Sequence, residues 1–347
     1  MLRYRIVALA ATAALALSPP SFAAAVTRPL FVDDTPRPTW FERYQESRQG
    51  PEQTEPFTGT YKIDANGAID LNQIAGDVRV TVGKGSEVRI EAIKRVRHRD
   101  PEEAKRLLSA MRVEVSQVGG RLEIRTVYPR MTGNRNFSGS VDYAIVVPQS
   151  VAVAIKTISV NVAVTGVQGE VRAETISGDV EVISTPNLAV AKTVSGDVRA
   201  RDISAGSLTL GAVSGTVIAT ALKVRTLEAV TVSGDVRLSD LQVERLMAKT
   251  LSGNIVFDGT LARGGRYEFN AHSGNVRLTL PGNTGGFELD ATTFSGSVRS
   301  DFPVTLRSAG PADGRPAANR SIHGTYGDAG SILSLRSFSG TVVITKR

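Results

Sequence analysis

Three aspartates occupy equivalent places in short repeated segments: Asp179, Asp197 and Asp235 each follow Ser-Gly and precede Val. If these segments stack as strands, Asp179 and Asp197 lie about 4.8 Å apart. Carboxylates that close repel each other unless a cation lies between them or each caps its own turn. Calcium requires six or more oxygens, several of them from carboxylates. Because the equivalent positions elsewhere hold Thr, Asn and Ser, the pattern favours a structural turn over a calcium ladder, and it predicts no metal ligand.

A run of basic residues offers a different chemistry, the binding of polyanions. The run spans residues 94–99, and its candidate ligand-binding residues are Lys94, Arg95, Arg97 and Arg99. Exposed clusters of Lys and Arg attract phosphorylated lipids and anionic glycans. The alternative is that the acidic residues at 102–103 offset this charge.

Four more arginines recur two residues after the Asp position of the repeat. They are Arg199, Arg237, Arg277 and Arg299. They could form a basic stripe for an anionic polymer, but Glu181 and Ile218 interrupt it. Pairing with neighbouring acidic side chains on the surface is the favoured interpretation, because such pairs are common on exposed strands.

The residues that most hydrolases and metalloenzymes need are not grouped in this sequence. The three histidines, His98, His272 and His323, are far apart, and there is no cysteine. No Ser-His-Asp arrangement with a nucleophile elbow, His-Glu-x-x-His motif or phosphate loop is present. We therefore predict no catalytic residue and no cofactor. The enzymatic alternative is an exported polysaccharide lyase or hydrolase, which would need acidic or basic residues from neighbouring repeats to converge in a cleft.

The elements that position these residues form an internal repeat with a Ser-Gly-x-Val corner. The serines of the corners are Ser177, Ser195, Ser214, Ser233, Ser252, Ser273, Ser295 and Ser339, preceded by a degenerate copy at Ser159. Successive serines are 18, 18, 19, 19, 19, 21, 22 and 44 residues apart. A short fixed period is typical of a solenoid. The sequence thus predicts an all-β fold, a β-solenoid or β-helix with coils of about 18–22 residues. The last gap, with its Gly- and Pro-rich segment 309–330, predicts one coil interrupted by a long loop.

Positions within each coil alternate between apolar and polar residues. Six, four and two residues before the serine stand mainly Leu or Val, then Ala, then Thr, which predicts the buried side of a strand. The residue just before the serine is apolar again, which predicts that the alternation changes phase at Ser-Gly. These residues are Ile176, Val194, Val213, Val232, Leu251, Phe294 and Phe338.

Residues 57–148 predict a strand-rich unit with one short helix, whose strands should continue into the solenoid as its cap. Asp100, Pro101 and Glu103 have the spacing of an N-cap, first helical residue and third helical residue, and the helix should run to about Ala110. The Gly-Gly pair at 119–120 predicts a hairpin turn. The solenoid region is assigned to residues 149–347.

Residues 1–23 read as a secretory signal peptide. Two arginines precede an apolar run at 6–17, which is shorter than a membrane span, and cleavage is predicted after Ala23 or Ala25. Residues 24–56 form a Pro-rich linker, with Trp40, Phe41 and Tyr44 as the aromatic exception. No other apolar segment is long enough to span a membrane. The signal and the lack of a nucleic-acid recognition motif exclude nucleic acid as the expected partner.

The repeated Thr-Val-Ser-Gly-Asp-Val coils and the strand 141–148 that ends in Val-Pro resemble the bacterial putative-adhesin domain family of unknown function. The resemblance covers about residues 57–347 and departs from the pattern at Ser159 and in segment 309–330. It implies an exported envelope protein with a solenoid-like β fold, and it brings no catalytic residues.

The sequence therefore predicts an exported, non-catalytic binding or scaffold protein of the bacterial cell envelope, located in the periplasm or at the cell surface. The expected partner is an envelope component: a glycan, a lipid surface or a protein. The alternatives are a polysaccharide-active enzyme and a purely structural, self-assembling protein.

Overall fold

The computed structural model describes residues 51–64, 66–129, 138–306 and 320–347. These residues form a nearly all-β fold, with 22 strands and one short helix. The predicted signal peptide, linker residues 24–50 and the three linker aromatics lie outside the described residues. Within the described part of the chain, no helix is long and apolar enough to cross a membrane.

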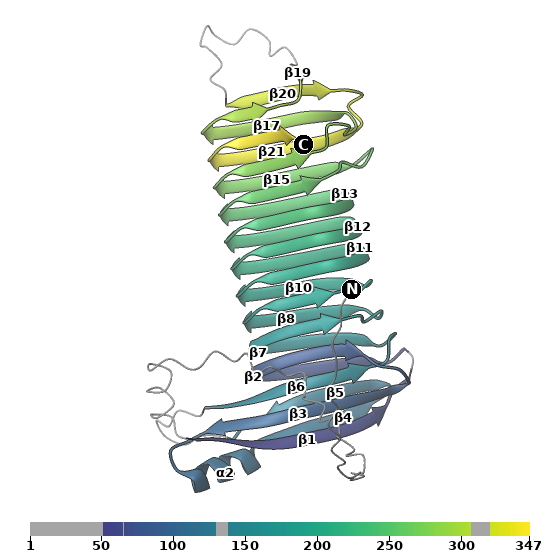
Figure 1. Ribbon diagram of the computed structural model, residues 1–347, viewed down its shortest axis with the longest axis vertical. Helices are drawn as coiled ribbons and strands as arrows, with labels where there is room; N and C mark the ends of the chain where they lie inside the picture. Colours follow the sequence, from purple (N-terminus) through teal and green to yellow (C-terminus); the bar gives the residue numbers. More distant parts are fainter. Residues whose placement is uncertain (1–50, 65, 130–137, 307–319) are drawn as a thin grey trace, which may run out of the picture. The chain divides into compact units, whose positions relative to one another are not determined.

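Helix α2 and the strands around it lie at one end of a stack of strands (Figure 1). Their bounds are β1 (Glu52–Lys62), β2 (Ala68–Val82), β3 (Glu87–Arg97), α2 (Pro101–Ala110), β4 (Arg112–Val118), β5 (Arg121–Val127) and β6 (Gly139–Val147). The helix begins as predicted, because the Asp100 side chain accepts a hydrogen bond from the Glu102 amide at 3.0 Å. The predicted turn at Gly119-Gly120 joins the antiparallel pair β4–β5, and both glycines have positive φ, 55° and 77°.

Strand β1 begins at Glu52, so residues 52–56 of the predicted linker belong to the folded body. Pro56 lies opposite Ile93 in the antiparallel β1–β3 pair. Among the described strands β1 pairs with β3 alone. A proline is compatible with such an edge strand because the missing amide donor faces away from the ladder. The high proline content is therefore the reason why the sequence pattern predicts a linker where β1 begins.

The remaining strands make up the repeats. Their bounds are β7 (Ala152–Thr165), β8 (Val171–Ser177), β9 (Val180–Ile183), β10 (Leu188–Ser195), β11 (Val198–Ser214), β12 (Val217–Ser233), β13 (Val236–Ser252), β14 (Ile255–Gly259), β15 (Arg266–Ser273), β16 (Val276–Leu280), β17 (Phe287–Ser295), β18 (Val298–Ser300), β19 (Thr305–Leu306), β20 (Ser321–Tyr326), β21 (Ser331–Ser339) and β22 (Val342–Lys346). Successive repeats pair in parallel and in register, so that Ser195, Ser214, Ser233 and Ser252 lie side by side.

The series of coils begins earlier than the sequence pattern indicated. In β2, Ala75-Gly76-Asp77-Val78 pairs residue by residue with the degenerate copy 159–162 in β7. Gly76 has φ 125°, like the corner glycines of later coils. Ala75 replaces the serine, so this coil lacks the Ser-Gly pair that marks the other corners in the sequence.

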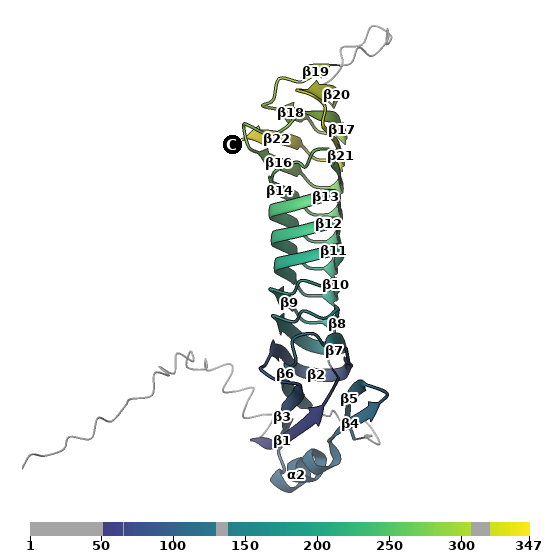
Figure 2. The same ribbon diagram turned by 90° about the vertical axis from the view of Figure 1, so that its right-hand side faces the viewer.

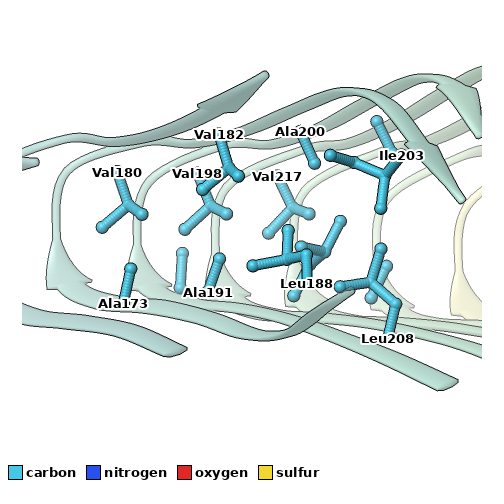
Figure 3. Close-up of a cluster of buried hydrophobic side chains, with 14 of the residues drawn as sticks. Ala173, Val180, Val182, Leu188, Ala191, Val198, Ala200, Ile203, Leu208 and Val217 are labelled. Carbon is cyan, nitrogen blue, oxygen red and sulfur yellow. The ribbon is translucent and has the colours of Figure 1, made fainter. Parts of the chain in front are cut away.

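One core runs through the whole described body. Strand β2 pairs in parallel with β5, β6 and β7, and the described residues from 51 onward form one compact unit. The strands of residues 57–148 thus continue into the repeats, with β2 pairing along the length of β7. Within the repeats, alanines and leucines of one wall face valines of the other, as Ala173, Leu188 and Val198 do in Figure 3.

The coils at the far end do not follow chain order. Strand β21 lies between β15 and β17 and pairs in parallel with both, while β22 lies between β16 and β18 (Figure 2). The predicted single coil with a long loop is therefore wrong. Instead, β20 runs antiparallel to β17 and covers its outer edge, and the chain then returns to insert a coil beneath. Covering the edge removes unpaired backbone groups that would otherwise invite aggregation.

This order can be tested by disulfide crosslinking, since the native chain has no cysteine. Ser273 is paired directly with Ser339, and neighbouring strands lie about 4.8 Å apart, within the Cα range of a disulfide. We expect the double variant Ser273→Cys/Ser339→Cys to form an intramolecular disulfide under mild oxidation, detected by mass spectrometry. The control Ser273→Cys/Ser295→Cys should not, because those residues lie two strand spacings apart, about 10 Å. Crosslinking of the control in preference to the test pair would contradict this arrangement and show that β17 lies directly beside β15.

Candidate functional site

The corner of each coil sets the geometry of the surface. The corner glycines have positive φ, for example 154° at Gly215 and 151° at Gly234. A Cβ atom at Gly234 would overlap the carbonyl oxygen of Gly215, so the backbones approach too closely for any other residue. The buried Thr231 hydroxyl donates to that same Gly215 carbonyl at 2.9 Å. Equivalent side chains of neighbouring coils are thereby held in straight rows.

The Asp/Asn row is a hydrogen-bonded ladder. The Asp179 carboxylate accepts from the Asp197 amide at 2.8 Å, and Asp235 accepts from the Asn254 amide at 2.9 Å. The other links are Asn161 to the amide of Asp179, Asp197 to that of Thr216, Asn254 to that of Asn275, and Asn275 to that of Thr341. Each side chain thus satisfies the backbone of the next coil, which is a structural role. Within the described residues no group of three or more His, Cys, Asp or Glu side chains is placed to hold a metal.

Two of the repeat arginines pair with this ladder. Arg199 bridges Asp179 at 2.9 Å and Asp197 at 2.5 Å, and Arg237 contacts Asp235 at 2.9 Å. The interpretation of these two as surface pairs is confirmed. The hydrogen bond from the backbone amide of the next coil lowers the pKa of Asp179 and of Asp235 below the ordinary value. Burial opposes this shift, and the hydrogen bond from Arg199 or Arg237 adds to it.

The basic run at 94–99 serves the fold. Lys94 is buried, and its Nζ contacts Glu55 at 2.6 Å and donates to the Met111 carbonyl at the end of α2 at 3.1 Å. Arg95 contacts Asp142 at 2.8 Å and Glu52 at 2.9 Å.

The rest of the run is engaged in a similar way. Arg97 also contacts Glu52, at 2.8 Å, and Arg99 has an interaction within the protein. The four candidates therefore do not form an open cationic patch. The acidic partners Glu52 and Glu55 come from the segment that was assigned to the linker, so the sequence pattern could not reveal this pairing.

A row of exposed apolar side chains runs along the stack instead. It consists of the residue just before each corner serine, and exposure ranges from 40% at Val232 to 66% at Phe294. The predicted change of phase at Ser-Gly is confirmed, because Thr175 is buried before the corner and Val180 and Val182 after it, and the residue just before the serine faces outward. In order along the stack the row, here called the apolar row, is Ile74, Ile158, Ile176, Val194, Val213, Val232, Leu251, His272, Phe338 and Phe294.

The apolar row ends in a stack of rings. The rings of His272 and Phe338 are nearly parallel, 7° apart in plane, with centroids 4.8 Å apart. The rings of Phe338 and Phe294 stack in the same way, at 4.8 Å and 4°. The sequence interpretation assigned no role to these rings, although their spacing before each serine was the available signal.

Beside the apolar row lies a shallow groove. Its other wall is the row three residues before each serine, here called the cationic row because four of its members are Lys156, Lys192, Lys249 and Arg336. Its floor is the row of buried threonines two residues before the serine. Two hollows, one over residues 156–232 and one over 231–338, lie along this same strip of surface. A groove with one apolar and one charged wall can hold a linear ligand.

The fold and this groove define a nearly all-β repeat protein with an extended surface groove. The model of the Toastrack DUF4097 family matches residues 66–345. The chain therefore belongs to the Toastrack DUF4097 family, and the resemblance drawn from its coils is confirmed at that level. Among curated proteins, no sequence matches the chain.

Solved structures of low identity resemble the chain. A putative adhesin from Bacteroides fragilis is 12% identical with a TM-score of 0.40, over 84% of this chain and 97% of the other. A putative lipid binding protein from Parabacteroides distasonis is 15% identical with a TM-score of 0.38, over 84% and 96%. A putative cell adhesion protein from Clostridium sporogenes is 11% identical with a TM-score of 0.27, over 84% and 100%. At these identities and TM-scores, the similarity to the three proteins gives no information about ligands of this chain.

The ladder makes a prediction for Asp235. Asp235→Ala leaves the Asn254 amide without its acceptor, so we expect unfolding free energy to fall by about 1–3 kcal/mol. Asp235→Asn should cost much less at neutral pH, since asparagines already fill this role at 254 and 275. Denaturant unfolding measures the stability of the two variants, and hydrogen exchange of the Asn254 amide reports on its hydrogen bond.

The same pair of variants tests the pKa direction. Because the folded pKa of Asp235 is lowered, its stabilisation is present above the ordinary value of 3.8 and is lost as pH falls through the folded pKa. Asp235→Asn should not show this part of the acid-dependent loss. Equal effects of the Ala and Asn variants, or unchanged exchange at Asn254, would contradict the ladder.

Proposed function

We propose that this chain is an exported, non-catalytic binding or scaffold protein of the bacterial cell envelope, and that its stack of coils is a β-solenoid. The groove between the apolar and cationic rows is its binding surface. The signal-like residues 1–23 support export to the periplasm or the cell surface.

One observation carries the proposal: the exposed row before the corners, apolar except for His272, is continuous along the stack. Single exposed apolar residues are ordinary on protein surfaces, whereas a contiguous apolar strip rimmed by polar residues is typical of an interaction site. Here the strip is built on in-register backbone with a Gly corner in nearly every coil, so a long ligand meets a preformed surface. Such preorganisation lowers the entropic cost of binding.

The carboxylates that come together in this fold support a structural role more than catalysis. Asp142 accepts from the Asp77 amide at 3.0 Å and from Arg95. Asp77 accepts from Asn161 at 3.0 Å, and Asp179 from the Asp197 amide. A general acid at neutral pH needs a raised pKa, whereas the pKa of Asp179 is lowered.

The proposal is tested by co-sedimentation of residues 24–347 with isolated cell-wall glycan and with membranes. We expect pelleting with an envelope fraction, and we expect Val213→Glu to reduce it severalfold, because a charge in the apolar row must be desolvated on binding. The matched control is Ile218→Glu, whose side chain lies in a different outward row that already holds Glu181.

Two results would overturn the proposal. One is that the native protein pellets with no envelope fraction. The other is that Val213→Glu and Ile218→Glu bind alike. Matching circular dichroism and thermal midpoints of the two variants establish that both are folded.

A further inference from the structure

We propose that the groove binds a linear anionic glycan that lies along the stack, with sugar C–H faces on the apolar row and acidic groups on the cationic row. This inference rests on the proposed binding function and adds the chemical class of the ligand. Three features of the groove support it: its length, the distribution of its charges and the hydrogen-bonding groups beside it.

The groove is long. The apolar row has ten members on adjacent strands, and nine spacings of 4.8 Å span roughly 43 Å. An acyl chain of a lipid would occupy less than half of that length. A flat membrane surface would not enter a groove. The length therefore favours a polymer.

The charges are spread along the groove. Cations stand at the second, fourth, seventh and ninth strands, as Lys156, Lys192, Lys249 and Arg336, and the one acid in this row is Glu174. Two further acids, Glu228 and Asp290, line the hollows from outside this row, so the cations outnumber the acids by four to three. In the part of the chain that the structure describes, the three lysines make no ion pair, and Arg336 has a long contact to Asp290 at 3.7 Å. A lipid carries its charge at one end, whereas a polyanion carries charge along its whole length, as these cations do.

A second copy of the chain fits less well. If two stacks met antiparallel about a two-fold axis through the middle of the groove, Lys192 would lie beside Lys249 of the other copy, and Lys156 beside its Arg336. Like charges so placed are destabilising. The groove therefore favours an acidic partner over itself.

An acidic peptide also fits less well than a glycan. The backbone groups of the coils are used between neighbouring strands, and the threonines of the floor donate to corner carbonyls, as Thr231 and Thr250 do. A peptide backbone along the groove would find only the corner serine hydroxyls as partners for its regularly spaced amides and carbonyls. The exposed corner serines border the apolar row on its other side, and their hydroxyls can both donate to and accept from sugar hydroxyls.

The test uses residues 24–347 and three defined probes: polygalacturonate as a linear anionic glycan, dextran as a neutral one, and phosphatidylglycerol vesicles as an anionic lipid surface. Calorimetry at low and high salt measures affinity. We expect polygalacturonate to bind, dextran to bind more weakly, and raised salt to weaken the anionic interaction because exposed charge contacts are screened.

The variant Lys192→Gln/Lys249→Gln should weaken polygalacturonate binding about tenfold or more, since two charge-assisted contacts are lost. The matched control Lys223→Gln/Arg225→Gln removes the same charge from exposed positions that do not line the groove, and it should bind as the native protein does. An equal loss of polygalacturonate affinity in the two double variants would contradict the assignment of the groove as the binding site.

The outcomes separate the ligand class from the function. Binding of vesicles or dextran without polygalacturonate would overturn the anionic-glycan inference and leave the binding function standing. Co-sedimentation with cell-wall glycan that polygalacturonate does not compete would also overturn it. Failure to bind any probe or any envelope fraction would overturn both.

Discussion

The close approach of one corner glycine to the next is the constraint on which this structure depends. The Gly234 amide donates to the Ser252 carbonyl of the following coil at 2.9 Å, and its Cα faces the Gly215 carbonyl of the preceding one. Only a residue without a Cβ allows both contacts. Because nearly every corner repeats this approach, with Val160 as the exception, strands remain in register over the stack, and side chains of one repeat position form rows. The groove and the core are both consequences of that register.

Rows of like residues create an electrostatic problem that the protein solves in two ways. Inside the corner row, each Asp or Asn accepts a hydrogen bond from the backbone amide of the next coil, and the Arg199 guanidinium bridges Asp179 and Asp197. In the cationic row, glycine, valine and glutamate separate the lysines, which reduces repulsion without cancelling the charge. The carboxylates of the first row are paired within the protein, whereas the three lysines of the second row make no ion pair in the described part of the chain.

The sequence predicted the repeat, the β content and the helix at 101–110 because each depends on local signals: a fixed period, alternation and an N-cap. It missed the first coil, where Ala75 replaces serine, and the strand at 52–56, where Pro56 resembles a linker. It assigned ligand binding to Lys94, whose partners Glu55 and Met111 are brought together only by the fold. The apolar row was visible in the sequence, but whether a residue beside a corner faces inward depends on the path of the backbone there.

The order of the coils links the fold to the groove. Phe338 lies between His272 and Phe294 because the coil at 331–346 inserts between two earlier coils. Without that insertion, Phe294 would follow His272 directly, and the row would be one ring shorter. Arg336, the ninth position of the cationic row, arrives with the same strand. The inserted coil therefore fills the core with Leu333 and Leu335 and at the same time completes both walls of the groove. A disturbance of its docking should thus affect stability and binding together, whereas changes at Lys192 or Lys249 should affect binding alone.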